Sequence, residues 1–333
     1  MKIIYRQIDE YIPVDTEKLR PKGSYNNLIS KRTHNLDELI DKYGKIPEDL
    51  LMKRNCPGCE SKNSKNIIKK DHLNIVKCLD CETVFVNPIF NEDYYRKTYQ
   101  SKEYQEIVKE LGEDSHNYRK ERFGQERVGI MKKFLKNKSN IKYLDIGSST
   151  GFVVEAAQEV GWDAMGIELN PSAVQFGKKR GLKIIKGDLL DCNLNNKKFD
   201  VISLFDVLEH LPSPRATINE VIKKLKPEGI IFLYVPNFDS ASRILMGDQA
   251  HFIWPSHHLN YYNPKTIKNF LDSFPLRVEY IATEGLDIED YIWYKEEVVK
   301  EDMQSVIKIK SQLQFFINAG GYGKNLRIIA RKK

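Results

Sequence analysis

Four of the five cysteines stand in two closely spaced pairs, a pattern that can hold a metal ion. The pairs are Cys56–Cys59 and Cys78–Cys81, and 18 residues separate them. Each C-x-x-C unit lets a tight turn aim two sulfurs inward, and four thiolates complete the tetrahedral coordination of Zn²⁺. A site with no open position holds the fold together and takes no part in chemistry. The spacing therefore predicts a structural zinc ribbon, with a disulfide or redox function and catalytic zinc as the alternatives.

Acidic residues follow a series of short apolar segments in the second half of the chain. The first segment leads into Asp145-Ile146-Gly147-Ser148-Ser149-Thr150-Gly151, where a glycine-rich turn lets a ligand approach bare backbone. The turn lacks the third glycine of a dinucleotide fingerprint and the G-K-[ST] ending of a phosphate-binding loop. Glu168 ends the second segment, where a carboxylate can accept two hydrogen bonds from ribose hydroxyls. Asp188 and Asp206 end the third and fourth segments.

The elements that must position these residues alternate between strand and helix. Strand-like segments (KYLDIG, AMGIEL, KIIKGD, FDVISLFD, GIIFLYVPN) are separated by helical patterns near residues 152–160, 171–180 and 214–226. This alternation predicts a parallel sheet with crossover helices. The carboxyl ends of parallel strands meet at one edge, so we expect the four acids to line one crevice.

The order of these motifs resembles that of class I S-adenosylmethionine-dependent methyltransferases. The resemblance rests on D-x-G-x-x-x-G, an acid ending the second strand, G-D ending the third, and FDVISLFDVLEHLPSP followed by LKPEGIIFLYVPN, and it covers roughly residues 118–333. It implies an α/β fold, with a Rossmann-like, seven-stranded, mostly parallel sheet and helices on both faces, here preceded by a small zinc ribbon. It also implies that the protein is a methyltransferase with S-adenosyl-L-methionine as its cofactor.

The resemblance assigns a role to each matching position. Asp145, Gly147 and Gly151 would surround the methionine part of the cofactor, and Glu168 would bind its ribose. Asp188 would receive the adenine amino group. Three further positions complete the implied cofactor site: Leu189 beside the adenine ring, and Phe205 and Asp206 below the sulfonium.

Three histidines are candidates for proton removal from the methyl acceptor, because imidazole titrates near neutral pH. His210 matches a position that is often His in small-molecule methyltransferases, where a role in shaping the pocket wall competes with direct proton transfer. His257 and His258 follow the fifth strand, in a segment that resembles the His-Leu-x-Tyr-Phe segment of deoxysugar C-methyltransferases. We expect His257 and His258, with Tyr261, to face the acceptor, and His258 to be the better candidate for proton removal because only His258 retains the base of that group. A packing role is the alternative for His258, and an acceptor that is already nucleophilic would need no base.

The chain divides into four predicted parts. Residues 1–52 form an amino-terminal arm, residues 53–90 the zinc ribbon, and residues 91–140 a helical cap. Aromatic residues at helical spacing in this cap are more often packing residues, and the alternative is that Tyr118 and Arg122 face the cofactor cleft. Residues 141–333 form the methyltransferase domain, with an acceptor-side loop at 237–264 and a helical insertion at 287–318.

Composition limits the class of protein and its partners. The chain has 333 residues, 41% hydrophobic and 30% charged, which argues against a disordered or low-complexity protein. No apolar run approaches the ~20 residues of a membrane span, and the start lacks a signal-peptide core, so we expect a cytoplasmic protein. The net charge of +7 comes from interleaved acidic and basic residues, typical of a solvated surface, with an electropositive cleft for an anionic substrate as the alternative.

The favoured function is methylation of a small polar metabolite, such as a sugar or a nucleotide-linked glycan precursor. One alternative is an RNA methyltransferase that grips phosphates with the zinc ribbon, although the ribbon lacks basic residues interleaved with stacking aromatics. The other is a non-catalytic module that binds cofactor or docks a protein through the ribbon. The sequence does not fix the acceptor, the atom methylated or the oligomeric state.

Overall fold

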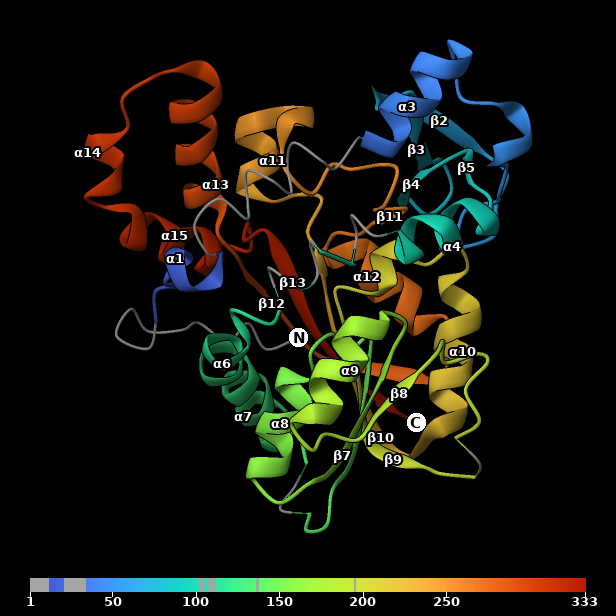
Figure 1. Ribbon diagram of the computed structural model, residues 1–333, viewed down its shortest axis with the longest axis vertical. Helices are drawn as coiled ribbons and strands as arrows, with labels where there is room; N and C mark the ends of the chain where they lie inside the picture. Colours follow the sequence, from blue (N-terminus) through green and yellow to red (C-terminus); the bar gives the residue numbers. More distant parts are fainter. Residues whose placement is uncertain are drawn as a thin grey trace.

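A seven-stranded sheet organises the larger part of the molecule (Figure 1). The computed structural model describes residues 12–20, 34–101, 105–106, 109, 112–135, 138–194 and 196–333, so residues 1–11 and 21–33 of the predicted amino-terminal arm lie outside the described residues. The strand order is β12-β13-β10-β9-β6-β7-β8. These strands are β6 (Lys142–Ile146), β7 (Asp163–Glu168), β8 (Ile184–Lys186), β9 (Phe199–Phe205), β10 (Leu225–Pro236), β12 (Leu276–Glu284) and β13 (Asn325–Lys332).

Five neighbouring strands, from β10 to β8, run parallel, and β13 is antiparallel to both β10 and β12. The predicted mostly parallel, Rossmann-like sheet is therefore confirmed. Its order changes direction at β6, the first strand, so a crevice opens at the carboxyl ends of β6 and β9 where the flanking connections diverge.

Helices cover both faces of this sheet because its strands are apolar on both sides. Tyr143 of β6 packs into one buried cluster with helices α7 (Gln125–Lys133) and α8 (Phe152–Glu159), whereas the next residue, Leu144, packs into the other. That second cluster contains side chains from α10 (Pro214–Lys224) and α12 (Pro264–Asp272). Successive side chains along the strand therefore point to opposite faces and pack into two different hydrophobic cores.

Local signals explain where the covering helices begin. Helices α9 (Pro171–Lys179), α10 and α12 each start with proline, whose missing N–H would be unpaired in the first turn anyway. Asn170 caps α9 by accepting a hydrogen bond from the Ala173 N–H at 3.1 Å. Asn263 and Thr266 form a reciprocal capping box on α12.

The cysteine-rich segment forms its own four-stranded sheet, in the order β11-β4-β3-β2, at the upper right of Figure 1. Three strands are local: β2 (Ser64–Lys70), β3 (Leu73–Cys78) and β4 (Val84–Val86). The fourth, β11 (Asn260–Tyr261), comes from the segment after β10, more than 170 residues later in the chain. The predicted ribbon and the predicted acceptor-side loop therefore share one sheet.

Shorter elements surround these two sheets. Beside the ribbon lie α3 (His34–Tyr43), the turn η2 (Glu48–Leu50) and the paired strands β1 (Leu51–Met52) and β5 (Ile89–Phe90), followed by α4 (Glu92–Gln100). Before β6 come α1 (Thr16–Leu19), α6 (His116–Arg119) and the π-turn η3 (Lys120–Gly124). After β9 and β10 lie η4 (Leu208–His210), α11 (Ala241–Met246) and η5 (Gly247–Gln249). The segment between β12 and β13 holds α13 (Asp287–Trp293), η6 (Tyr294–Val299), α14 (Gln304–Ile307) and α15 (Lys310–Ala319).

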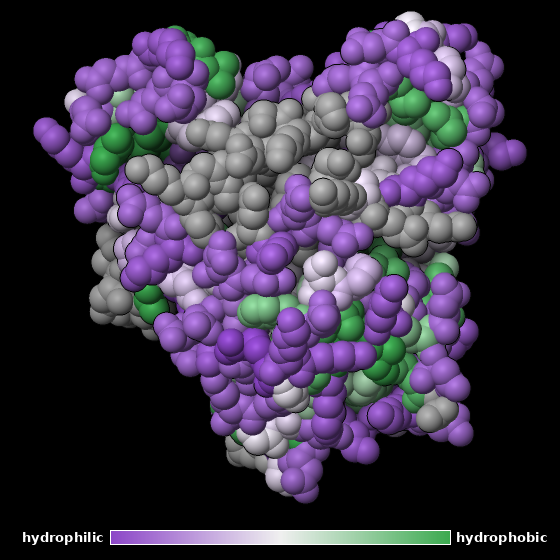
Figure 2. Space-filling model, in the orientation of Figure 1, coloured by the Kyte–Doolittle hydropathy of each residue, from purple (hydrophilic) through white to green (hydrophobic). Residues whose placement is uncertain are grey.

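The face shown in Figure 2 is largely hydrophilic over the described residues, with hydrophobic side chains in scattered groups. Among the described residues, no helix is both long enough and apolar enough to cross a membrane.

Arg327 of β13 forms ion pairs that link the helical cap to the sheet. Its buried guanidinium lies 2.5 Å from Glu284 Oε2 on β12 and 2.8 Å from Glu126 Oε2 on α7. Removing one partner of a buried ion pair is costly because the remaining charges stay in a poorly solvated place.

We expect Arg327→Met to lower the free energy of unfolding by about 3 kcal/mol, because two carboxylates lose their buried cation. Urea unfolding followed by circular dichroism measures the change. The control is Arg277→Met on β12, whose side chain is 62% exposed beside Glu279 and should cost less than about 1 kcal/mol. A cost for Arg327→Met as small as that of the control would contradict this account.

Candidate active site

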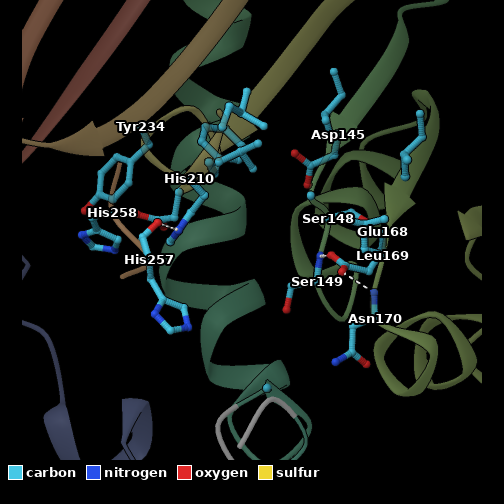
Figure 3. Close-up of a pocket in the computed structure, with 18 of the residues that line it drawn as sticks. Asp145, Ser148, Ser149, Glu168, Leu169, Asn170, His210, Tyr234, His257 and His258 are labelled. Atoms are coloured by element: carbon cyan, nitrogen blue, oxygen red, sulfur yellow. Dashed lines mark hydrogen bonds between the residues drawn. The ribbon is translucent and has the colours of Figure 1, made fainter. Parts of the chain in front are cut away.

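A cavity of about 1280 Å³ opens at the carboxyl ends of the parallel strands. Figure 3 shows its two sides: the ends of β6 and β7 carry Asp145 and Glu168, and a group of histidines faces them across the cavity. Seven of the eight residues of the implied cofactor site line this cavity, and the eighth, Gly151, lies against Leu182 and Ile184. The lining members are Asp145, Gly147, Glu168, Asp188, Leu189, Phe205 and Asp206.

The turn after β6 leaves its backbone open because two positions accept only glycine. Gly147 and Gly151 have φ angles of +70° and +85°, in the left-handed region that side chains disfavour. A Cβ atom on Gly147 would lie 2.4 Å from Val207 Cγ2, and one on Gly151 would lie 2.6 Å from Leu182 Cδ1. Gly147 therefore lies in close contact with Val207, and both residues line the cavity.

Asp145 is 2% exposed and sits in a short hydrogen-bonded chain. Ser203 Oγ donates to Asp145 Oδ1 at 2.5 Å, and the Tyr143 hydroxyl lies 2.6 Å from Ser203 Oγ. Burial raises the pKa of Asp145 to about 7, although the Ser203 hydrogen bond and the nearby Arg127 charge oppose the shift. A cationic ligand group beside Asp145 would favour its ionised form.

Glu168 is held in place by backbone donors from both sides of the cavity floor. The Ser149 N–H donates to Oε2 at 2.7 Å and the Asn170 N–H donates to Oε1 at 2.8 Å (Figure 3). Burial nevertheless raises the pKa of Glu168 above its usual range. Each oxygen keeps further acceptor capacity, which matches a pair of vicinal ribose hydroxyls.

Asp188 lies on the next strand end, in a short loop after β8. Its Oδ1 accepts a hydrogen bond from the Leu190 N–H at 2.8 Å, and the neighbouring Leu189 is buried. A carboxylate beside an apolar wall suits an amino-substituted aromatic ring. Together with the open glycine turn and Glu168, these groups fit an adenosine carrying an amino-acid chain, so the residues present fit S-adenosylmethionine.

Two arginines of the helical cap reach the end of β9. Arg127 is buried, with its guanidinium carbon 4.2 Å from the Phe205 ring centroid and 4.9 Å from that of Tyr234. Arg119 lines the same cavity, and burial lowers its pKa to about 10. Both lie close enough to Asp206 to oppose the effect of burial on its pKa.

Tyr118 and Arg122, the candidates from the sequence for facing the cleft, are turned away from it. The Tyr118 hydroxyl accepts a hydrogen bond from the Asp15 N–H, and Arg122 donates to the Ile12 carbonyl and to Glu126. Arg119, Phe123 and Arg127, at helical spacing from one another, line the cavity instead. The helical cap lines the cleft as predicted, but Tyr118 and Arg122 lie on the side of its helices that does not face the cleft.

The histidine side of the cavity is built by η4 and by the segment that leads into β11. His210, His257 and His258 all line it, as do Trp254 and Tyr234. The His210 and His258 ring centroids are 4.8 Å apart, and Trp254 stacks on His257 at 3.9 Å. Burial lowers the pKa of His210 to about 4 and that of His258 well below its usual range, so both are neutral near pH 7.

Tyr261, expected to face the acceptor, does not line the cavity. It pairs with Val84 in the ribbon sheet, is 1% exposed, and packs with Phe238. The strand pairing that carries His258 to the cavity turns the side chain of Tyr261 into the ribbon core, so this prediction is wrong.

The four paired cysteines converge as the zinc hypothesis requires. The Sγ atoms of Cys56 and Cys81 are 3.5 Å apart, those of Cys59 and Cys78 are 3.6 Å apart, and all four lie within 4.8 Å of one another. Zn–S bonds of ~2.3 Å in a tetrahedron separate the sulfurs by roughly 3.8 Å. The cluster therefore fits Zn²⁺, and His72, exposed on a turn, is not part of it.

Arg54 ties this ribbon to the histidine side of the cavity. Its guanidinium donates to three backbone carbonyls: that of Val86 at 3.1 Å, that of Pro212 at 3.1 Å and that of Leu259 at 2.5 Å. Pro212 lies two residues after His210, and Leu259 directly follows His258. The ribbon thus fixes the backbone beside both imidazoles.

A family model matches the middle of the chain. Residues 118–281, just under half of the chain, match the family described as Methyltransferase domain. This segment of the chain is similar to a methyltransferase domain. The cavity opens at the carboxyl ends of β6, β7, β8 and β9, all of which lie within the matched residues.

Curated relatives match part of this chain. The chain is 32% identical over 107 residues to a ubiquinone biosynthesis O-methyltransferase of Haemophilus ducreyi, a match covering 29% of this chain and 45% of the relative. It is 30% identical over 152 residues to the mitochondrial enzyme of that name from Candida albicans, covering 40% of this chain and 46% of the relative. The chain thus spans about half the length of each of these two relatives.

Solved structures with related architecture are distant in sequence. The plantazolicin methyltransferase BpumL, solved in complex with SAH, is 14% identical, with a TM-score of 0.48 over 72% of this chain and 93% of that one. A SAM-dependent methyltransferase from Archaeoglobus fulgidus is 19% identical, with a TM-score of 0.42 over 73% of this chain and 100% of that one.

Sequence reasoning missed four residues in or beside this site: Arg54, Arg119, Arg127 and Glu209. Arg54 stands two residues before the first cysteine, and nothing local shows that it bonds carbonyls 158 and 205 residues away. Arg119 and Arg127 carried a signal in their helical spacing, which places them on one face of the cap. Glu209 had a further signal, because it precedes His210 in a segment already assigned to the pocket wall.

Proposed function

We propose that the protein transfers the methyl group of S-adenosylmethionine to a hydroxyl of a small polar metabolite, with a sugar or nucleotide-linked glycan precursor as the expected class. The observation that carries this proposal is one cavity with adenosine-matching acids on one side and neutral imidazoles on the other (Figure 3). The names of the curated relatives support oxygen as the acceptor atom. Arg119 and Lys324 in the lining favour an acceptor that carries negative charge.

Bound S-adenosylmethionine supplies a methyl group that its sulfonium already activates, so the chain contributes mainly alignment and acceptor ionisation. Glu168 and Asp188 hold the adenosine, the turn at Gly147 leaves room for the methionine chain, and Asp145 lies near its amino group. His210 and His258 present neutral rings to the acceptor side and assist the loss of its proton. His257 and Trp254 form the aromatic wall.

The zinc ribbon serves the acceptor side in this proposal. Its sheet contains β11, and Arg54 holds the carbonyls beside His210 and His258. Structural Zn²⁺ bound by Cys56, Cys59, Cys78 and Cys81 would therefore support the acceptor site from outside the cavity.

Glu168→Ala and Gly147→Val should each weaken S-adenosylmethionine binding at least tenfold. The first removes the carboxylate that accepts hydrogen bonds from the ribose hydroxyls, and the second adds a side chain to the glycine turn beside the methionine part of the cofactor. Calorimetric titration of the folded variants measures the affinity. Asp163→Ala is the matched control, since Asp163 begins the same strand that Glu168 ends and its side chain is 59% exposed. Affinities of both test variants within twofold of wild type would refute the cofactor assignment.

A Cys78→Ser/Cys81→Ser double variant should lose its zinc and become more sensitive to protease in the ribbon, because metal binding supplies folding energy to so small a unit. Elemental analysis should give about one zinc per wild-type chain. Turnover should also fall while S-adenosylmethionine affinity stays near wild type, since the ribbon supports the histidine side alone. Loss of zinc with unchanged protease resistance would contradict the structural role.

His258→Asn should lower the methyl-transfer rate by ~10²–10⁴ with cofactor affinity nearly unchanged. The asparagine amide can keep the hydrogen bond that His258 Nδ1 makes with the Phe252 carbonyl, but it lacks the Nε2 atom. Turnover is measured with labelled cofactor and whichever of three pools, nucleotide sugars, small metabolites or RNA, is methylated. His72→Asn, at an exposed turn, is the control.

Full turnover in His258→Asn together with its loss in His210→Asn would transfer the ionising role to His210. Methylation confined to the RNA pool would overturn the small-molecule acceptor and favour the RNA hypothesis. Cofactor binding without turnover on any pool would favour a non-catalytic module.

A further inference from the structure

A second group of metal-ligand side chains lies on the histidine side of the cavity, away from the cysteines. Glu209, His210 and His258 place one carboxylate oxygen and two ring nitrogens within 4.8 Å of one another. Glu209 and His210 belong to η4, and His258 comes from the segment that enters the ribbon sheet. Two imidazoles and one carboxylate are a ligand set for divalent first-row transition metals.

Backbone carbonyls fix the tautomer of both imidazoles. His210 Nδ1 lies 2.9 Å from the His257 carbonyl, and His258 Nδ1 lies 2.8 Å from the Phe252 carbonyl. A carbonyl oxygen only accepts, so each Nδ1 carries the hydrogen and each Nε2 carries the lone pair. Histidine ligands of metal ions are commonly oriented by this same bond from the other ring nitrogen.

Glu209 gives an independent reason to expect a cation. Its side chain is 1% exposed, and among the described residues its Oε2 atom has no hydrogen-bond partner. The nearest His210 nitrogen, Nε2, lies 3.9 Å from Oε1, too far for a hydrogen bond. A buried carboxyl oxygen left without a donor is unfavourable, and a metal ion between these side chains would satisfy it.

We propose that Glu209, His210 and His258 bind one divalent transition-metal ion, and that this ion binds and ionises the acceptor hydroxyl. The inference rests on the proposed function and deepens it, because it states how the imidazoles act. Three protein ligands leave coordination positions open for substrate. Ligands at ~2.1 Å from one ion lie roughly 3.0–3.4 Å apart, so binding would draw these three side chains slightly closer than they stand.

The chemistry balances without an oxidant or reductant. The acceptor oxygen coordinates the ion, whose charge lowers the pKa of the hydroxyl, and the proton leaves to water. The oxygen lone pair forms the new bond to the methyl carbon as the carbon–sulfur bond breaks. The electron pair of that bond remains on sulfur, which becomes a neutral thioether.

This site differs in ligand type from the cysteine cluster, which makes the two separable. Four thiolates favour Zn²⁺, whereas two imidazoles and a carboxylate accept Co²⁺ and leave open positions. Co²⁺ bound to nitrogen and oxygen also absorbs visible light without the thiolate charge-transfer band of a cysteine site. Co²⁺ is therefore the probe for zinc-loaded protein.

The test is titration of zinc-loaded, full-length protein with Co²⁺ by calorimetry and visible absorption, without cofactor or acceptor. We expect one Co²⁺ per chain beyond the zinc, without the thiolate band. Glu209→Gln and His258→Asn should each weaken this affinity by about 10–100-fold or more. The control, His72→Asn, should bind Co²⁺ as wild type does. The proposed site would be overturned if the zinc-loaded protein bound no additional Co²⁺, or if both test variants bound Co²⁺ with wild-type affinity.

Activity then separates this inference from the proposed function. Wild-type protein freed of the second metal, with its zinc retained, should lose at least tenfold in turnover, keep its S-adenosylmethionine affinity, and recover on adding Co²⁺. Full turnover without the second metal would overturn the ionising role and leave His258 as a direct base. Failure to bind S-adenosylmethionine, with Co²⁺ binding intact, would refute the proposed function and not the metal site.

Discussion

The parallel alignment of β6, β7, β8 and β9 is the constraint on which the rest of this site depends. Each strand ends at the same edge of the sheet, so each needs only one suitable residue after its last buried position to contribute to a common crevice. Glycine at position 147 lets the turn after β6 approach Val207 closely, where a side chain would clash, and both residues line the crevice. The cofactor half of the cavity is therefore a direct product of strand order and of local turn geometry.

The acceptor half depends on contacts between distant parts of the chain. A guanidinium is costly to desolvate, and Arg54 offsets that cost by donating to three carbonyls that converge from the ribbon, from the loop after η4 and from the segment before β11. The pairing of β11 with β4 adds backbone hydrogen bonds to the same junction. The ribbon therefore stabilises the position of the histidine side of the cavity.

This difference explains how much of the site could be predicted from sequence. Asp145 and Glu168 lie at the ends of strands, and Asp188 and Asp206 follow strands, whose apolar character is visible locally, so both the sheet and their common edge could be predicted. Tyr261 could not be placed, because its orientation depends on a strand pairing with residues near position 84. The helices of the cap could be predicted, but the face that they turn toward the cavity is set by packing against the rest of the protein. Arg119 and Arg127 line the cavity, whereas Tyr118 and Arg122 do not.

The histidine side also shows how burial can prepare side chains for chemistry. Desolvation disfavours the imidazolium form, and the Nδ1 hydrogen bonds to carbonyls leave both Nε2 lone pairs available. Protonated rings would repel a cation and could not take up a proton, so the same burial suits direct proton removal and metal coordination. Glu209 distinguishes the two: the carbonyls already orient both rings, and the Glu209 carboxylate, 3.9 Å from His210 Nε2, makes no hydrogen bond to that ring. A carboxylate placed beside two lone pairs and bonded to neither ring is better explained as a third ligand than as part of a proton relay.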